Sequence, residues 1–204
     1  ATESGTITVD PIHAIALSSA AATETQTLCI NTPITDITYT LSGGATGATV
    51  TGLPAGVTAS VTGNTLTITG TPTTTTGSPF TYAITTTGNT CTVATEAGTI
   101  TVDPVHAIAL SSLPATETQT VCINSAITDI TYTLSGGATG ATVTGLPAGV
   151  TSSVTGNTLT ITGTPSTLTG SPFIYAITTT GNSCIVATES GTITVDPIHA
   201  IALS

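Results

Sequence analysis

The 204-residue sequence contains no Lys and no Arg, and this absence excludes two large classes of partner. Ten carboxylates and three His give a formal net charge of −10. Proteins hold nucleic acids through Lys and Arg, and they bind anionic membrane surfaces through polybasic patches. The sequence therefore predicts no nucleic-acid partner and no binding to such membranes. Carboxylates without Lys or Arg are typical of a solvated protein surface that repels other copies of the same protein.

Met and Trp are also absent, and long apolar runs are missing. A membrane helix needs about 20 consecutive apolar residues, and no stretch approaches that length, so we expect no membrane insertion. The N-terminal residues do not have the pattern of a signal peptide. We expect any secretion signal or anchor to lie outside this segment.

Thr is the most abundant residue, with 55 of 204 positions, and β-branched residues favour strands. Hydrophobic residues make up 39% and charged residues only 5%, which does not suit a disordered chain. No window shows sustained apolar spacing of three and four. The composition therefore predicts an all-β fold.

A repeat of 93 residues runs through the chain. The segment that begins Ala-Thr-Glu at Ala1 returns at Ala94 and again at Ala187, and residues 1–93 and 94–186 differ at only 13 positions. Within each repeat, short alternating strands such as Ile37-Thr38-Tyr39-Thr40-Leu41 are separated by Gly and Pro turns. The period and this pattern predict tandem Ig-like antiparallel β-sandwich modules of about seven strands.

The repeat phase predicts four segments along the chain. Residues 1–13 are the last strand of a preceding repeat with a linker, 14–103 are module one, 104–196 are a linker and module two, and 197–204 begin a following repeat. A flexible tether is absent at the junction, and Pro104 fixes one φ angle. We expect the two modules to stack as a semi-rigid rod.

Each module has two cysteines, and four cysteines allow three pairings. A Cys91–Cys122 bond would have to close across extended chain that rises about 3.3 Å per residue. A Cys29–Cys91 bond joins the opening segment to the start of the last strand, and these regions are neighbours in Ig-like folds. We therefore predict the pairs Cys29–Cys91 and Cys122–Cys184, with four reduced thiols as the alternative.

The remaining reactive residues give weak signals. Asp103 and Glu117 are candidate Ca²⁺ ligands, although Ca²⁺ needs six to eight oxygens and solvated acids are the simpler interpretation. His13, His106 and His199 are too sparse for a zinc site and are expected to pack at the module junctions. A Thr–Gln ester at Gln26 or Gln119 is a minor alternative. No catalytic residue and no other cofactor are predicted, so we expect the chain not to be an enzyme.

Two turn sequences carry a family resemblance. Gly52-Leu53-Pro54-Ala55-Gly56-Val57 and Gly70-Thr71-Pro72, each repeated 93 residues later, resemble Ig-like domains of bacterial surface proteins. Together with the strings around Cys29 and Ile37, they are similar to repeats in giant cell-surface adhesins of Bacteroidota, including gliding-motility adhesins. The resemblance implies display on the bacterial cell surface as the shaft of a long filament.

The sequence leaves three functions open. The first is a structural shaft whose partners are the adjacent repeats, with an external surface or glycan bound by a tip outside this segment. The second is a self-assembling filament subunit whose end strands complete its neighbours. The third is a ligand- or glycan-binding module, which would normally expose aromatic residues.

Overall fold

The computed structural model describes residues 2–198, which form two compact units, one ending at Asp103 and the other beginning at Pro104. We call them module one and module two. Residues 2–12 contain no strand, whereas residues 95–103 of module one, which match residues 2–10, form a strand. A strand forms only beside another strand that accepts and donates its backbone hydrogen bonds. In this sequence, no strand precedes residues 2–12 that could pair with them. The assignment of residues 1–13 to a preceding repeat stays a prediction, and 199–204 lie outside the described residues.

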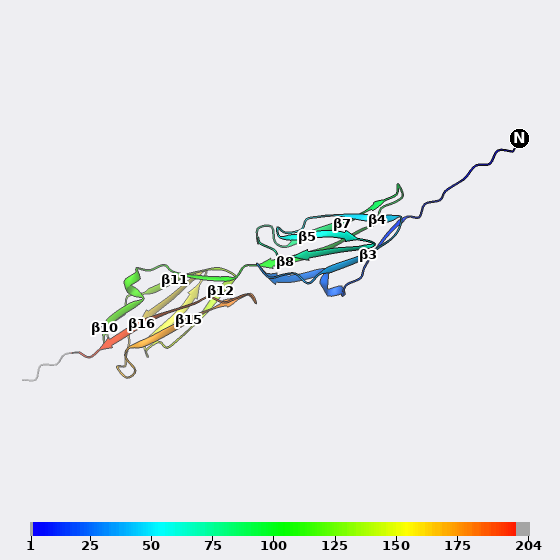
Figure 1. The fold of residues 1–204 in the computed structure, drawn as a ribbon. Helices are drawn as coiled ribbons and strands as arrows, with labels where there is room; N and C mark the ends of the chain where they lie inside the picture. The colour runs from blue at the N-terminus through cyan, green and yellow to red at the C-terminus, as the bar shows by residue number, and fades with distance from the viewer. Residues whose placement is uncertain (1, 199–204) are drawn as a thin grey trace, which may run out of the picture. The chain divides into compact units, whose positions relative to one another are not determined.

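Module one is built from two four-stranded sheets (Figure 1). One sheet has the order β1-β3-β6-β5 and the other β2-β8-β7-β4. All neighbouring strands are antiparallel except β2 and β8, which run parallel. The elements are β1 (His13–Leu17), the 3-10 helix η1 (Ala21–Thr23), β2 (Thr25–Cys29), β3 (Ile37–Gly43), β4 (Ala45–Thr51), β5 (Val57–Thr62), β6 (Thr65–Gly70), β7 (Phe80–Gly88) and β8 (Thr95–Asp103).

Module two repeats this topology with sheets β13-β14-β11-β9 and β10-β16-β15-β12. Its parallel pair is β10 and β16. The elements are β9 (His106–Leu110), η2 (Pro114–Thr116), β10 (Thr118–Cys122), β11 (Ile130–Gly136), β12 (Ala138–Thr144), β13 (Val150–Thr155), β14 (Thr158–Gly163), β15 (Phe173–Gly181) and β16 (Thr188–Asp196).

The Ig-like sandwich is confirmed, and its described part has eight strands per module, one more than the approximate number predicted. The additional strand arises because the opening segment changes sheets at η1. Before η1, β1 pairs with β3; after it, β2 pairs with β8. The crossing is held by the buried Thr23, whose hydroxyl lies 2.7 Å from Ser19 Oγ and donates to the Ala20 carbonyl.

The core follows from the alternation of apolar residues and Thr. In β3, Ile37, Tyr39 and Leu41 are fully buried on one face. In the register with β6, Ile37 lies opposite Ile68 and Tyr39 opposite Leu66, so each inward residue meets another inward residue. Phe80 is only partly buried and packs against this core.

The two turn sequences that carry the family resemblance lie against each other. The amide of Thr71 donates to the Gly56 carbonyl at 3.0 Å, and the amide of Thr73 donates to the Ala55 carbonyl at 2.9 Å. Gly56 has a φ of +89°, and a Cβ there would contact the Thr71 carbonyl oxygen. Glycine is therefore required, because a side chain would be strained and would also meet backbone.

The largest sequence differences between the modules lie on the surface. Four exposed apolar side chains of module two replace small or polar residues, and nothing in the structure explains the change. They are Leu113, Leu168, Ile174 and Ile185, which stand where module one has Ala20, Thr75, Thr81 and Thr92.

Candidate functional site

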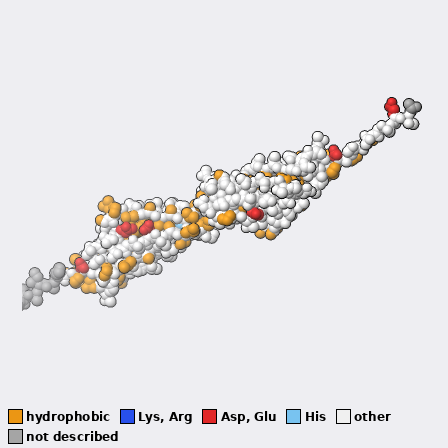
Figure 2. All heavy atoms as spheres, in the orientation of Figure 1, with side chains coloured by type: hydrophobic (Ala, Val, Ile, Leu, Met, Phe, Trp, Pro, Cys, Tyr) orange, Lys and Arg blue, Asp and Glu red, His pale blue; other side chains and the backbone are white. Residues whose placement is uncertain are grey.

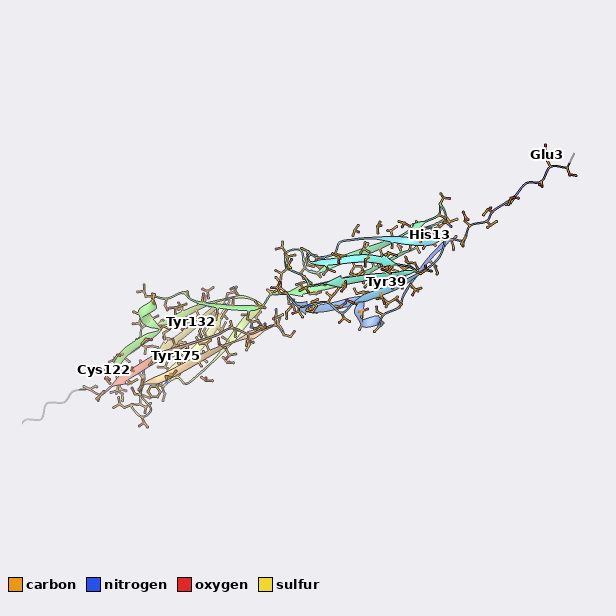
Figure 3. The ribbon with its side chains drawn as sticks, viewed as in Figure 1. Glu3, His13, Tyr39, Cys122, Tyr132 and Tyr175 are labelled. Atoms are coloured by element: carbon orange, nitrogen blue, oxygen red, sulfur yellow. The ribbon has the colours of Figure 1, made fainter. Side chains whose placement is uncertain are left out.

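Each module has two ends that matter for function. The leading end of module one lies beside Asp10 and His13, where the chain enters, and the trailing end lies at Asp103, where β8 finishes. In module two, the matching residues are Asp103 and His106 at the leading end and Asp196 at the trailing end. Figure 3 shows His13 at the leading end of module one and Cys122 near the trailing end of module two.

A buried histidine closes the leading end of module one. His13 is 5% exposed, its Nε2 lies 3.0 Å from Asn89 Oδ1, and its Nδ1 lies 2.9 Å from Thr86 Oγ1. Asn89 Oδ1 also accepts from the Cys91 amide, while Asn89 Nδ2 donates to the Pro11 carbonyl. Because Oδ1 is an acceptor, His13 donates from Nε2.

The same cluster recurs in module two around His106, Thr179 and Asn182. These contacts hold β1 or β9 to the loop that follows β7 or β15 in the same module. The expectation that histidines pack at the junctions is therefore refined, because the partners of His13 and His106 lie inside their own modules. His199 lies outside the described residues.

A tyrosine pair links the two sheets of each module. Figure 3 labels Tyr39 of module one and both members of the pair in module two, Tyr132 and Tyr175. The Tyr39 hydroxyl of β3 donates to Glu24 Oε1 at 2.9 Å, and its oxygen lies 3.2 Å from that of Tyr82 in β7. Burial, followed by the hydrogen bonds to Tyr82 and Glu24, raises the pKa of Tyr39 well above that of a free phenol. Burial also raises the pKa of Tyr82, although its hydrogen bond with Tyr39 opposes this shift.

The candidate Ca²⁺ ligands belong to different modules and different surroundings. Asp103 is the last residue of β8, whereas Glu117 follows η2 in module two. Glu117 Oε1 accepts a hydrogen bond from the buried Tyr132 at 2.9 Å, so this carboxylate already has a packing role. Over residues 2–198, no three His, Cys, Asp or Glu gather into a group that could hold a metal ion. A cation at Asp103 and Glu117 stays a prediction.

Gln26 has a structural role that the sequence did not reveal. Its Nε2 donates to the carbonyls of Thr23 and Thr35, and its Oε1 accepts from the Thr35 amide at 2.8 Å. These bonds fasten the segment between β2 and β3, and Gln119 does the same in module two. In both glutamines, the oxygen and the nitrogen of the side-chain amide are hydrogen-bonded. This structural role explains the two residues without an ester.

The predicted disulfide pairs are wrong. Cys29 and Cys184 are disulfide-bonded, whereas Cys91 and Cys122 carry free thiols, so neither pair within a module is present. The reason lies in the parallel pairing of β2 with β8, which puts Cys29 opposite Asp103 at the trailing end. Cys91 precedes the start of β8 at Thr95, at the leading end.

The length of β8 separates these two cysteines. Nine strand residues at about 3.3 Å each span roughly 30 Å, whereas the Cα atoms of a disulfide lie within about 7 Å. The cysteines are near each other in the topology diagram of an Ig-like fold but lie at opposite ends of the strand. Cys122 and Cys184 are kept apart by β16 in the same way.

The surface offers little for chemistry. Figure 2 shows a few acidic side chains and no cationic one on the visible face. The described residues enclose no pocket. Residues 2–198 contain no helix that is long and apolar enough to cross a lipid bilayer. The expectation that the chain is not an enzyme stays a prediction.

The sequence matches no protein-family model and no curated protein. Among solved structures, it resembles a titin fragment, A168169, at 10% identity and a TM-score of 0.49, covering 92% of this chain and 100% of that one. It also resembles the EC3-6 fragment of protocadherin gammaB7 at 12% identity and a TM-score of 0.49, covering 90% and 47%. The tandem Ig repeats of Dlar match at 10% identity and a TM-score of 0.35, covering 93% and 100%. The fold assignment rests on the strand pairing described above, and these likenesses add nothing about function.

Proposed function

We propose that this chain is a segment of the shaft of a long, repetitive extracellular protein, and that its modules transmit tension between a cell and whatever the protein attaches to. The observation that carries the proposal is the direct continuity of the repeat. β8 ends at Asp103 and β9 begins at His106, so only Pro104 and Val105 separate the two sandwiches. Such a junction leaves no flexible tether that would take up force.

The topology of each module is suited to tension along the chain. Force applied at the two ends pulls β2 toward the leading end and β8 toward the trailing end. Because β2 and β8 are parallel neighbours over five residue pairs, from Thr25 with Thr99 to Cys29 with Asp103, this force shears their hydrogen bonds together. A shear load must break all the hydrogen bonds between β2 and β8 at once, whereas a peeling load would break them one at a time.

An oxidising compartment agrees with this role. Disulfides persist in secreted and cell-surface proteins and are rare in the cytosol, and Cys29 and Cys184 are disulfide-bonded. The resemblance to giant adhesins of Bacteroidota, including gliding-motility adhesins of the SprB type, supports placing the shaft on a bacterial cell surface. The ligand would then be bound by a tip outside this segment.

One structural feature favours the alternative of a self-assembling subunit. Residues 5–9 have the sequence of a last strand but no strand partner, and Ile7 and Val9 are 91% and 86% exposed. Another copy could complete such a segment by strand addition. In the shaft, the same residues would instead belong to the preceding repeat of one continuous polypeptide.

The size of the parent polypeptide separates these two functions. We would boil intact surface material in denaturant, with and without reductant, and measure the mass of the polypeptide that carries this repeat. The shaft requires a single chain many times larger than the 19.9 kDa of this segment, in both conditions. A reduced band near 19.9 kDa would contradict the shaft and support strand exchange.

A further inference from the structure

β5 is an edge strand of module one, and it pairs with β6 on one side only. The Thr71 amide donates to the carbonyl of Gly56, the residue before β5, and this bond sets which residues of β5 face β6. Because hydrogen-bonded positions alternate in an antiparallel pair, Thr58 and every second residue after it bond to β6. Ala59 and Val61 direct their N–H and C=O groups away from β6. No other backbone group of residues 2–198 bonds to them.

β13 is the matching edge strand of module two, and its backbone groups alternate in the same way. The Thr164 amide donates to the Gly149 carbonyl at 2.9 Å, so the outward N–H and C=O groups belong to Ser152 and Val154. Ser152 stands where module one has Ala59, and both side chains are exposed. Each module therefore presents one edge with the same pattern of unpaired backbone groups.

These edges lack the features that normally prevent edge strands from pairing. Soluble proteins protect such strands with charged side chains, Pro, bulges or short length. The six residues of β5 and of β13 include no charged residue and no Pro, and their registers with β6 and β14 have no shift. By contrast, β4 has a register shift between Ala45 and Gly47. The other two edge strands, β1 and β2, have five residues each and are joined at η1, where the chain changes sheets.

The unpaired groups of β5 are complementary to those of a second copy. If two β5 strands lie antiparallel, Ala59 faces the second copy's Val61 and Val61 faces its Ala59. Each facing pair exchanges two N–H···O=C bonds, so the two pairs form four bonds. Ser60 then lies opposite the second copy's Ser60, and this small, exposed side chain leaves room for the close approach at that position.

Repulsion between copies limits this pairing but does not act at the edge itself. The chain has a net charge of −10, whereas β5 has no charged residue. Asp36, just before β3, accepts a hydrogen bond from Thr69 of β6, and β6 lies between β3 and β5. Two strand spacings amount to about 10 Å, which is close to the Debye length of about 10 Å at 0.1 M salt. Salt should therefore weaken the repulsion while the backbone bonds remain.

We infer that β5 and β13 are pairing edges for a second copy of this chain, with each edge joining the same kind of edge antiparallel to form one continuous sheet. Every chain carries two such edges, so weak single contacts add up when many repeats lie alongside one another. In a shaft, this pairing would bundle filaments laterally. The bundling role rests on the proposed function, whereas the pairing of two copies does not.

Sedimentation of the 204-residue chain tests the pairing, with Cys91 and Cys122 alkylated so that no new disulfide links two copies. We would compare micromolar with millimolar protein at low and at high salt. We expect reversible association at the higher protein concentration, and stronger association at high salt. A single monomeric species under all four conditions would overturn the inference.

A matched pair of charge variants separates edge pairing from general stickiness. Ser60→Glu combined with Ser153→Glu puts a carboxylate opposite its own copy at the centre of each pairing, where like charges repel. Thr85→Glu combined with Thr178→Glu has the same net charge, and both of these residues are exposed in the other sheet. We expect association of the serine variant to be several-fold weaker than that of the threonine variant. Equal weakening in both would overturn the inference.

A proline variant removes donors that the single chain does not use. Ala59→Pro combined with Ser152→Pro deletes one outward N–H from each edge and no bond to β6 or β14. Each pairing loses two of its four bonds, so association should weaken by about tenfold or more, with an unchanged far-UV circular dichroism spectrum. Unweakened association of the folded variant would contradict the inference. If the variant loses its strand signal, the glutamate variants decide the question.

Amide exchange measured by NMR locates the contact. Ala59 and Ser152 differ between the repeats, so their signals identify the two edges separately. We expect both amides to exchange quickly in dilute solution and slowly in concentrated solution. Slow exchange confined to residues 5–9 would instead indicate strand addition by the opening segment and would overturn the inference. This result does not depend on the size of the parent polypeptide, so the shaft can fail while the pairing stands, or the reverse.

Discussion

Tyr39 and Tyr82 approach within 3.2 Å through their hydroxyl oxygens, although they lie on different sheets of module one. Both side chains are fully buried, and Tyr39 also donates to the Glu24 carboxylate. The pair is therefore a polar link between the sheets in an otherwise apolar core, and it fixes their separation.

Replacing Tyr39 with Phe should lower the free energy of unfolding of module one by about 1–2 kcal/mol, because Glu24 and Tyr82 each lose a hydrogen bond. The chain has no Trp, so urea unfolding is best followed by far-UV circular dichroism. Tyr132→Phe is the matched variant for module two. A stability equal to that of the unchanged chain in both variants would show that the link contributes nothing.

Stability should fall at alkaline pH. Burial raises the pKa of Tyr39, Tyr82, Tyr132 and Tyr175 in the folded chain, whereas the unfolded residues ionise near pH 10. Below about pH 10 the folded and unfolded tyrosines are both protonated, and above it only the unfolded ones lose protons. The loss should approach 1.4 kcal/mol per pH unit for each tyrosine, until the folded pKa is reached.

The measurement is a urea series between pH 9 and 12 with tyrosinate absorbance recorded in parallel. We expect tyrosinate to appear only as the strand signal disappears. Normal titration near pH 10 in a chain that keeps its circular dichroism would contradict the burial of the pair.

Gly98 should tolerate no side chain. A Cβ at Gly98 would meet the Tyr82 hydroxyl and the Glu24 carbonyl, one of them backbone. We expect Gly98→Ala to destabilise module one by more than about 2 kcal/mol, because β8 must shift and the tyrosine link must open. Gly63→Asn is the control, since a side chain there meets nothing within 4 Å and Asn accepts a positive φ. Equal stability of the two variants would argue against this packing.

Thr86→Val should destabilise module one more than the similar shapes of the two side chains suggest. The Thr86 hydroxyl accepts from the Ala94 amide at 2.8 Å and contacts His13, and both partners would lose their bond in a buried site. We expect a loss of about 2–3 kcal/mol in urea unfolding. Thr85→Val, one residue away and exposed, should change stability by no more than about 0.5 kcal/mol. A similar loss of stability in the two variants would show that the hydrogen bonds around His13 do not stabilise the leading end.

The alternation of apolar residues and Thr was enough to predict the inward face of β3 and the burial of Tyr39, because period-two patterning and burial are properties of a single strand. The disulfides could not be predicted in this way. The positions of Cys29 and Cys91 depend on which strand lies beside β8 and in which direction. That choice follows from the change of sheets at η1, which is set by the burial of Thr23 rather than by any turn sequence. Gln26 was missed because its partners are backbone groups.

Stretching single molecules of the reduced chain between its ends tests most directly whether the modules carry tension. Reduction removes the disulfides, so only the sandwiches resist. We expect two abrupt unfolding events of similar force, each releasing about 300 Å of contour for a module of some 90 residues. The shear of β2 against β8 and of β10 against β16 predicts this behaviour. Smooth lengthening at low force, without resolved events, would contradict the proposal that this chain is a tension-bearing shaft.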